Sequence, residues 1–221
     1  MPPVVGKLRM ARILVGCEES QAVTIELRKL GHEAYSCDTV SSSGGYPEWH
    51  LQMDVFQAID LMNWDAGIFF PPCTYLTISA NKWYKDQPKR KSGKLVGAER
   101  RQAREEAIDF FLKLYNCKIK KVAIENPIGV MSTRFRKPDQ VIQPFMFGHL
   151  EQKATCLWLR GLHTLVETDN VEEEMKKLTK KERERIHYMS PSIGRSMERS
   201  KTFPGIAKAM AKQWFGNHGD E

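Results

Sequence analysis

Two short apolar runs, each followed directly by reactive side chains, most constrain the fold of this chain. Residues 66–70 (AGIFF) lead into a Pro-Pro-Cys sequence that ends at Cys73, and residues 122–124 (VAI) lead into a Glu-Asn-Pro sequence that begins at Glu125. Short, bounded runs of β-forming residues predict buried strands. Because chemistry in an open α/β sheet gathers beyond the carboxyl ends of its strands, the sequence predicts a thiol and a carboxylate at two such ends.

Strand-like and helix-like segments alternate along the whole chain. We expect strands at residues 11–15, 33–37, 66–70, 122–124 and 153–159, and helices at 20–30, around 103–114 and at 206–214. Gly31 fits the left-handed position just past the first helix. Alternating charges predict one solvated helix over residues 172–185. The alternation predicts an α/β, Rossmann-like fold with a mostly parallel sheet and helices on both faces.

Length and composition narrow the class of protein. A chain of 221 residues, 41% of them hydrophobic, suits a single domain with a sizeable core. It contains no apolar stretch of membrane-spanning length and begins without the apolar segment of a signal peptide. Its five cysteines are odd in number and include no Cys-x-x-Cys pair. We therefore expect free thiols in a cytoplasmic protein, with no metal site and no membrane contact.

The positive charge is concentrated in residues 82–104, which we call the basic segment. It holds nine Lys and Arg residues against two acidic ones, an excess that equals the net charge of +7 of the whole chain. Glycine, proline and serine in its middle predict a mobile loop. A charge run is often only a solvated surface, but the position just after Cys73 favours contact with phosphates. The candidate nucleic-acid-binding residues are Lys82, Lys89, Arg90, Lys91, Lys94, Arg100 and Arg101.

The turn after the first expected strand is a candidate cofactor site. Asp38 follows Gly16 by 22 residues and ends the second strand, where a carboxylate accepts hydrogen bonds from ribose hydroxyls. The turn lacks Gly-x-Gly-x-x-Gly, and its two glutamates would repel a pyrophosphate. A sulfonium cofactor with a free amino group suits these carboxylates better. Asp38 also fits the simpler role of an ordinary strand-end aspartate.

Cys73 and Glu125 each have a simpler alternative role. Free cysteines are usually inert, small, buried hydrophobes, and we assign that role to the other four. Cys73 differs because two prolines fix the backbone before it and the basic segment follows it. Nearby positive charge lowers a thiol pKa, so we expect the basic segment to activate Cys73. Glu125 also fits a role as a helix cap or as a partner of Lys121.

The two strand-end motifs resemble the Pro-Cys and Glu-Asn-Val motifs of DNA cytosine-5 methyltransferases, especially the short phage and prophage members. Their order, their 52-residue separation and their place at strand ends all fit that family. Asp54 lies in a Met-Asp-Val segment similar to the family's Gly-Asp-Ile, and residues 204–211 resemble its last motif. Lys153 and Thr155 lie near the place of the family's Gln-x-Arg-x-Arg motif, which is absent here.

The resemblance implies a class I methyltransferase fold in one catalytic domain over residues 1–221, acting on cytosine C5 in DNA. It implies Cys73 as the nucleophile and Glu125 as the group that hydrogen-bonds the cytosine ring. The residues that it implies for S-adenosylmethionine are Gly16, Cys17, Glu18, Ser20, Asp38, Asp54 and Pro71. A phage-encoded protein of this family would act in the host cytoplasm.

Three departures from the family keep other functions open. Cys-Glu-Glu replaces the usual Phe-x-Gly-x-Gly, Thr74 replaces a glutamine, and about eighty residues between Glu125 and the last helix leave no room for a large target recognition domain. Specificity would then be low or supplied by a protein partner. Two alternatives remain: an enzyme of the same fold that modifies a free pyrimidine nucleotide or RNA, and a catalytically degenerate nucleic-acid-binding protein.

Overall fold

A seven-stranded sheet forms the centre of the computed structural model, which describes residues 10–78, 81–189 and 199–216. The strands are β1 (Arg12–Gly16), β2 (Glu33–Asp38), β3 (His50–Gln52), β4 (Ala66–Phe69), β5 (Lys121–Pro127), β6 (Gln140–Ile142) and β7 (Thr155–Arg160). Their order is β3-β2-β1-β4-β5-β7-β6, with β7 antiparallel to both of its neighbours and all other pairs parallel. This arrangement confirms the predicted Rossmann-like class I methyltransferase fold.

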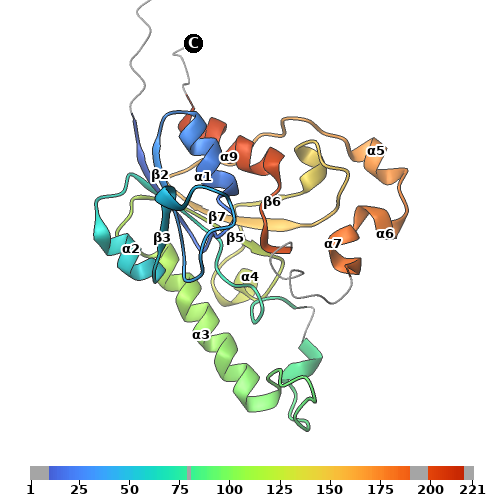
Figure 1. The fold of residues 1–221 in the computed structure, drawn as a ribbon. Helices are drawn as coiled ribbons and strands as arrows, with labels where there is room; N and C mark the ends of the chain where they lie inside the picture. The colour runs from blue at the N-terminus through green and yellow to red at the C-terminus, as the bar shows by residue number, and fades with distance from the viewer. Residues whose placement is uncertain (1–9, 79–80, 190–198, 217–221) are drawn as a thin grey trace, which may run out of the picture.

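Helices cover both faces of the sheet, as predicted (Figure 1). On one face lie α1 (Ala22–Lys29) and α9 (Pro204–Phe215), and on the other lie α2 (Val55–Leu61) and α3 (Gly97–Tyr115). Strand periodicity explains the two cores, because Ile13 and Val15 of β1 pack on the first face while Leu14 packs on the second. Gly31 has φ +84°, the left-handed conformation expected just after α1.

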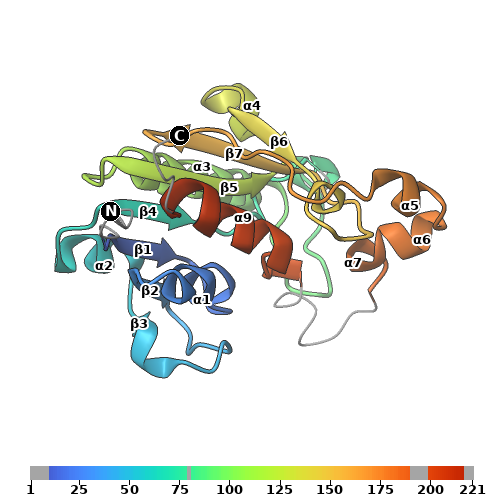
Figure 2. The ribbon, with the colours of Figure 1, turned by 90° about the horizontal axis from the view of Figure 1, so that it is seen from above.

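Short helices connect these layers. They are η1 (Pro47–Trp49), η2 (Asn81–Tyr84), α4 (Met131–Arg134), η3 (Pro144–Met146), α5 (Glu172–Lys176), α6 (Lys180–Arg183) and α7 (Arg185–Tyr188). Figure 2 shows α5, α6 and α7 beyond the carboxyl ends of β1 and β4, whereas α2 lies at the opposite end of these strands. Among the described residues, no helix is both long enough and apolar enough to cross a membrane.

Two expectations from the sequence are wrong. Residues 172–185 form parts of three short helices rather than one, because Thr179 and Glu182 make a capping box that begins a new helix at Lys180. The basic segment is not a loop throughout, since α3 already begins at Gly97 and includes its last three arginines. The strand expected at residues 122–124 also extends through Pro127, because β7 pairs with it as far as Thr155.

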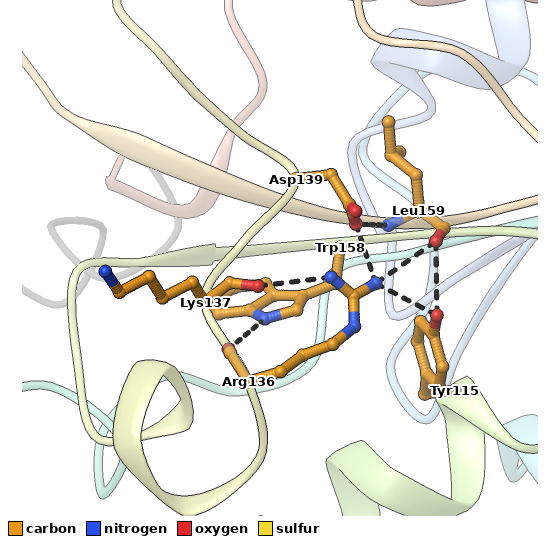
Figure 3. A network of polar contacts seen from close by, with 6 residues as sticks. All are labelled: Tyr115, Arg136, Lys137, Asp139, Trp158 and Leu159. Atoms are coloured by element: carbon orange, nitrogen blue, oxygen red, sulfur yellow. Dashed lines mark hydrogen bonds and ion pairs between the residues drawn. The ribbon is translucent and has the colours of Figure 1, made fainter.

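A polar network fixes β7 next to the β6 edge of the sheet (Figure 3). The Arg136 guanidinium donates to Asp139 Oδ2 at 2.7 Å, to the Tyr115 hydroxyl at 3.0 Å and to the Leu159 carbonyl oxygen at 3.2 Å. The Trp158 indole nitrogen donates to the Arg136 carbonyl oxygen at 2.9 Å. The network joins the end of α3 to the loop before β6 and to β7. It therefore holds in place the strand that pairs with the Glu-Asn-Pro end of β5.

Candidate active site

A cleft of about 1060 Å³ opens at the carboxyl ends of the parallel strands. It is lined by residues that follow β1 and β4 and by residues that end β2 and β5, the place where ligands bind in open α/β sheets. The rest of the lining comes from the basic segment, from the residues before β7, and from Ile186, Arg199, Ser200 and Thr202. Segments far apart in the sequence therefore meet at a single site.

Hydrogen bonds tie the Cys73 loop to the Glu125 strand end. Asn126 Nδ2 donates to the Pro71 carbonyl oxygen at 2.9 Å, and the Val130 amide donates to the Leu76 carbonyl oxygen at 2.8 Å. Thr77 and Gly129 form an antiparallel bridge between the two segments. A Cβ atom at position 129 would lie 2.2 Å from the Leu76 carbonyl oxygen, so this close approach requires glycine. Both predicted catalytic side chains, Cys73 and Glu125, line the same cleft.

The electrostatics of Cys73 differ from the sequence-based expectation. The thiol is exposed at the cleft wall, yet its pKa is raised because the surrounding walls displace water and the Glu125 carboxylate lies nearby. The positive charges that lower its pKa belong to Lys153 and Arg199. The prediction that the basic segment would lower the thiol pKa is therefore wrong. Segments that are distant in sequence supply the activating cations instead.

Glu125 is half-buried at the end of β5, where its carboxyl group is shielded from water. Burial raises the pKa of its carboxyl group above the ordinary value, and the positive charge of Lys153 and a hydrogen bond with Thr155 partly offset this rise. Lys153 is itself fixed, since its Nζ donates to the Arg199 carbonyl oxygen at 2.9 Å. Thr155 is absent from the cleft lining and reaches the site only through Glu125. A raised pKa favours the protonated form, in which Glu125 is able to donate a hydrogen bond.

The β1–α1 turn has glycine-like backbone geometry without glycine. Cys17 and Gln21 have φ values of 59° and 58°, which are uncommon for residues with side chains. Glu18 turns inward and accepts hydrogen bonds from the Val23 amide at 2.6 Å and from the Thr24 hydroxyl at 2.8 Å. Its carboxylate thus occupies the N-terminus of α1, the position at which nucleotide-binding α/β folds place a phosphate. Burial raises the Glu18 pKa to about 7.

Glu19, the next residue, lines the cleft instead of capping the helix. Both of its carboxylate oxygens are buried and, among the described residues, neither has a hydrogen-bond partner, although the side chain lines the cleft. Asp38 lines the cleft as well, and its Oδ1 accepts from the Val40 amide at 3.3 Å. The Asn126 Oδ1 atom is a further buried acceptor without a partner among the described residues. This part of the cleft is therefore rich in acceptors and suits a ligand that carries donors or positive charge.

The other cofactor candidates divide into two groups. Cys17, Ser20 and Pro71 line the cleft. Cys17 remains a protonated thiol, because burial first and then the charge of Asp38 raise its pKa. Gly16 and Asp54 are not among the lining residues. Gly16 packs under Phe69, whose ring would lie 2.6 Å from an added Cβ atom, and Asp54 caps α2 by accepting from the Phe56 amide at 2.8 Å.

Within the basic segment, the α3 arginines make contacts inside the protein. Arg104 lies 3.4 Å from the Tyr84 ring centre and donates to the Tyr75 carbonyl oxygen at 2.9 Å, two residues after Cys73. Arg100 is buried, and Arg101 donates to Asp86 Oδ1 at 2.9 Å. Arg104 and Arg100, which lies over the Tyr75 ring, therefore brace the Cys73 loop, a role that the charge run did not indicate.

Only some of the residues predicted to bind phosphates line the cleft. Arg90, Lys94, Arg100 and Lys153 line it, whereas Lys82, Lys89, Lys91 and Arg101 do not. Arg90 stacks at 3.8 Å from the Trp83 ring centre, and Lys89 pairs with Glu99 at 3.4 Å. Sequence reasoning missed Glu19, Asn126, Trp83 and Arg199 as lining residues. Glu19, Asn126 and Trp83 had a signal, because they lie inside segments already singled out, whereas Arg199 had none. Across the described residues, no three His, Cys, Asp or Glu side chains gather as a metal site.

Of the comparisons with known proteins, only the one with solved structures gives matches. No protein-family model and no curated protein matches the chain. It is similar to a solved structure described as a DNA modification methyltransferase encoded within an E. coli prophage, with TM-score 0.42, 11% identity, and coverage of 83% of this chain and 56% of that one. A triple mutant of Spodoptera frugiperda DNMT2 gives TM-score 0.39, 15% identity, and coverage of 73% and 53%.

The S. pombe Dnmt2 methyltransferase gives TM-score 0.40, 12% identity, and coverage of 76% of this chain and 54% of that one. The present chain therefore spans about half the length of the solved structures it matches. At these identities the likeness concerns the fold alone. The chemistry of the cleft residues is what bears on function.

Proposed function

We propose that this protein is an S-adenosylmethionine-dependent methyltransferase that modifies C5 of cytosine in DNA through a covalent bond to Cys73. Residues 1–221 would act as one catalytic domain without a large target recognition domain. The observation that carries the proposal is the shared cleft of Cys73 and Glu125, whose loops are hydrogen-bonded to each other. This arrangement supplies a nucleophile and an acid on one rigid frame, as covalent catalysis on a ring requires.

In the proposed mechanism, the Cys73 thiolate forms a bond to C6 of the cytosine. The electron pair of the C5–C6 double bond moves into the ring, and protonated Glu125 donates a hydrogen bond to N3 as negative charge develops there. C5 thereby becomes nucleophilic. When bound, S-adenosylmethionine supplies an electrophilic methyl group to C5. Loss of the C5 proton to a base then re-forms the double bond and expels Cys73. Lys153 and Arg199 assist by favouring the thiolate.

The acceptor-rich side of the cleft supports a cationic cofactor. Glu18 already fills the α1 N-terminus, so a pyrophosphate would meet a carboxylate at that position rather than free amides. Glu19 presents two buried oxygens that accept no hydrogen bond within the described part of the chain, and they suit the ammonium group of a methionine moiety. Asp38 ends β2, where its carboxylate would accept hydrogen bonds from ribose hydroxyls.

The cationic side of the cleft supports a nucleic-acid substrate. Arg90, Lys94, Lys153 and Arg199 all line it. Such groups bind phosphates without reading sequence, so recognition would be weak or depend on a partner protein. Reaching C6 of a paired cytosine requires that the base leave the stack. We propose action on cytoplasmic DNA, which for a phage-encoded protein would be that of the host cell.

Two measurements test the proposed function. Bisulfite sequencing of DNA from a methylation-deficient host that expresses the protein should reveal 5-methylcytosine, and the Cys73→Ala variant should yield none. DNA containing 5-fluorocytosine should trap the wild-type protein covalently, because the fluorine does not leave as a proton does. Methylation found only on RNA or on a free nucleotide would show that this molecule, and not DNA, is the substrate. DNA binding with neither trapping nor methylation would indicate a degenerate enzyme.

A further inference from the structure

A histidine from a distant loop caps the start of α9. The helix begins at Pro204, and its N-cap residue is Phe203, whose phenyl ring cannot accept a hydrogen bond. The Gly205 amide, in the first turn of the helix, instead donates to His149 Nε2 at 2.9 Å. Because the first amides of a helix have no partner within the helix, His149 supplies the acceptor that Phe203 lacks.

The fit between His149 and the start of α9 is close. A Cβ atom at position 205 would collide with the Phe147 carbonyl oxygen and would lie 2.9 Å from His149 Nε2, so this approach requires glycine. Since Nε2 accepts a hydrogen bond, the imidazole is neutral and carries its proton on Nδ1. Burial lowers the pKa of His149, which favours the same form. A neutral ring also suits the positive end of the helix dipole better than a cation does.

The residues just before α9 connect this cap to the cleft. The Phe203 ring lies 5.1 Å from the His149 ring, centre to centre, and 5.8 Å from Lys153 Nζ. Lys153 Nζ in turn donates to the Arg199 carbonyl oxygen at 2.9 Å. Both Lys153 and Arg199 line the cleft that contains Cys73. Phe203 is therefore a neighbour of the cap on one side and of a cleft cation on the other.

Lys153 and Arg199 are also the cations that act on Cys73. Their positive charges lower the pKa of its thiol and oppose the effects of burial and of Glu125. Charge interactions weaken with distance, so a displacement of residues 199–203 would remove part of this support. The formation of the Cys73 thiolate thus depends on how firmly these residues are anchored.

We propose that His149 is a positioning residue for Cys73. By capping α9 from outside the helix, it holds residues 199–203 against the cleft and keeps Arg199 and Lys153 beside the thiol. The inference rests on the proposed function for its consequence, which is faster attack of the thiolate on the cytosine ring. The reactivity of the thiol itself is measurable without DNA and without a methyl donor.

The test measures the ionisation of Cys73 directly. Iodoacetamide reacts with thiolates, so its rate at the Cys73 peptide, followed by mass spectrometry across a pH series, reports the pKa of that thiol. His149→Ala removes the acceptor and should move the midpoint of the profile to higher pH. Below the midpoint the reaction should slow roughly tenfold, since a nearby opposite charge shifts a pKa by about one unit or more.

The direction of the shift distinguishes positioning from a general loosening of the protein. Burial is the largest cause of the raised pKa of Cys73. A cleft that merely opened would let water reach the thiol, and the midpoint would then move to lower pH. A purely structural role of His149 would lower the free energy of unfolding without moving the midpoint.

Two variants serve as controls. His149→Gln keeps a side-chain acceptor and should restore the wild-type profile. His163→Ala removes a histidine from the other end of α9, where its Nε2 bonds to the Gln213 carbonyl oxygen at 2.9 Å. His163 does not line the cleft, so this variant should leave the profile unmoved. Urea unfolding of all three variants verifies that each is folded under the conditions of the assay.

The outcomes separate His149 from the proposed function. A midpoint at higher pH in His149→Ala alone supports the inference. An unchanged or lower midpoint in that variant overturns it, as does an equal rise in His163→Ala or no recovery in His149→Gln.

Transfer of tritium from labelled S-adenosylmethionine to DNA is scored separately with the same proteins, and His149→Ala should slow it roughly tenfold below the midpoint of the profile. Wild-type protein that transfers no label loses the proposed function, whereas the shift of the thiol profile still supports the role of His149. Label transfer by the wild type with an unmoved midpoint in His149→Ala retains only the proposed function.

Discussion

The β1–α1 turn and the paired Cys73 and Glu125 segments lie on the same cleft but are built from opposite chemistry. The turn is stabilised by a carboxylate, Glu18, and presents another, Glu19, to the cleft. The paired segments are joined by backbone and amide hydrogen bonds and face the cations Lys153 and Arg199. Since β7, which follows Lys153, lies across β4 and β5 from β1, acidic and basic groups occupy different sides of the cleft.

This contrast shows that the charge of the cleft is divided between two sides, and the proposed function would place one ligand on each side. A methyl donor with sulfonium and ammonium groups is cationic, and a nucleic-acid acceptor is a polyanion. Each would meet the side of the cleft that attracts it and would be repelled by the other side. The following predictions test the division, starting with changes that should remove the chemistry and ending with those that should only weaken an interaction.

The largest effects are expected on the Cys73 and Glu125 side. Cys73→Ala should abolish methyl transfer, because no covalent bond to C6 is possible. Glu125→Gln should lower kcat by about 10²-fold or more, since it removes the acidic proton while keeping the size of the side chain. Initial rates with tritiated S-adenosylmethionine measure both.

Cys117→Ala is the matched control for Cys73, because this thiol does not line the cleft. It should leave the rate unchanged. S-adenosylmethionine affinity should also be unchanged in Glu125→Gln, because that residue belongs to the substrate side. A fully active Cys73→Ala variant would remove the nucleophile from the mechanism and with it the division of roles.

The strand ends were the predictable part of this site. Bounded apolar runs placed β1, β2, β4 and β5, and the rule for open sheets placed Cys73, Glu125 and Asp38 near each other. The sequence also contained the Thr-x-x-Glu signal that splits residues 172–185 at Thr179. That signal could have been used, whereas alternation of charge alone led to one helix.

The other residues of the site could not be predicted, because their roles depend on side-chain direction, which the local sequence does not determine. Glu18 and Glu19 are adjacent and chemically identical, yet the positive φ of Cys17 precedes a turn in which one caps α1 and the other faces the cleft. Arg104 belongs to a charge run, but Tyr84 and the carbonyl groups of the Cys73 loop draw it inward. Arg199 reaches Cys73 only through tertiary folding.

The next largest effect is expected on the pH dependence of the free energy of unfolding, through Glu18. Its folded-state pKa of about 7 lies above the ordinary value of 4.5, so between these pH values the folded protein keeps a proton that the unfolded chain releases. The contribution of protonated Glu18 to the free energy of unfolding is therefore fully present below pH 4.5 and is lost as the pH rises through 7. The difference corresponds to about 3 kcal/mol at 1.36 kcal/mol per pKa unit.

Glu18→Gln should lack this loss of stability at high pH. Urea unfolding of the wild type and the variant at pH 5 and pH 8.5 measures the difference between their free energies of unfolding, which should shift in favour of the variant as pH rises. Exposed Glu174→Gln is the control and should show no such shift. Parallel pH profiles for wild type and Glu18→Gln would mean that the cap is not under electrostatic strain.

A smaller effect of mixed sign is expected at Glu19. Glu19→Gln replaces a carboxylate whose buried oxygens have no hydrogen-bond partner among the described residues, so the free energy of unfolding of the ligand-free protein should rise. The same change should weaken S-adenosylmethionine binding about tenfold or more, because hydrogen bonds to charged groups contribute roughly 1.5–3 kcal/mol. Calorimetric titration and urea unfolding measure the two quantities. Glu48→Gln, exposed and outside the cleft, should change neither. A Glu19→Gln protein with lower stability and unchanged affinity would contradict the proposal that Glu19 binds the ammonium group of S-adenosylmethionine.

The smallest effect is expected from the exposed lysines of the basic segment. Lys91 and Lys94 have no ion pair among the described residues, in contrast to the internally engaged arginines of α3, so they remain available to phosphates. Each duplex phosphate neutralised contributes about −0.9 to the slope of log affinity against log salt concentration. Lys91→Ala/Lys94→Ala should therefore flatten that slope by up to about 1.8 and weaken binding equally for all sequences.

The matched control removes the same charge elsewhere. Lys208→Ala/Lys212→Ala alters two exposed lysines of α9, which packs on α1 away from the cleft lining. Both double variants have the same net charge, so an effect of overall charge alone would weaken DNA binding in each of them alike. A flatter salt slope only in the Lys91 and Lys94 variant, with unchanged S-adenosylmethionine affinity, would place the polyanion on the basic side. Equal slopes in the two variants would mean that the basic segment is a solvated surface and that the division by charge stops at Lys153 and Arg199.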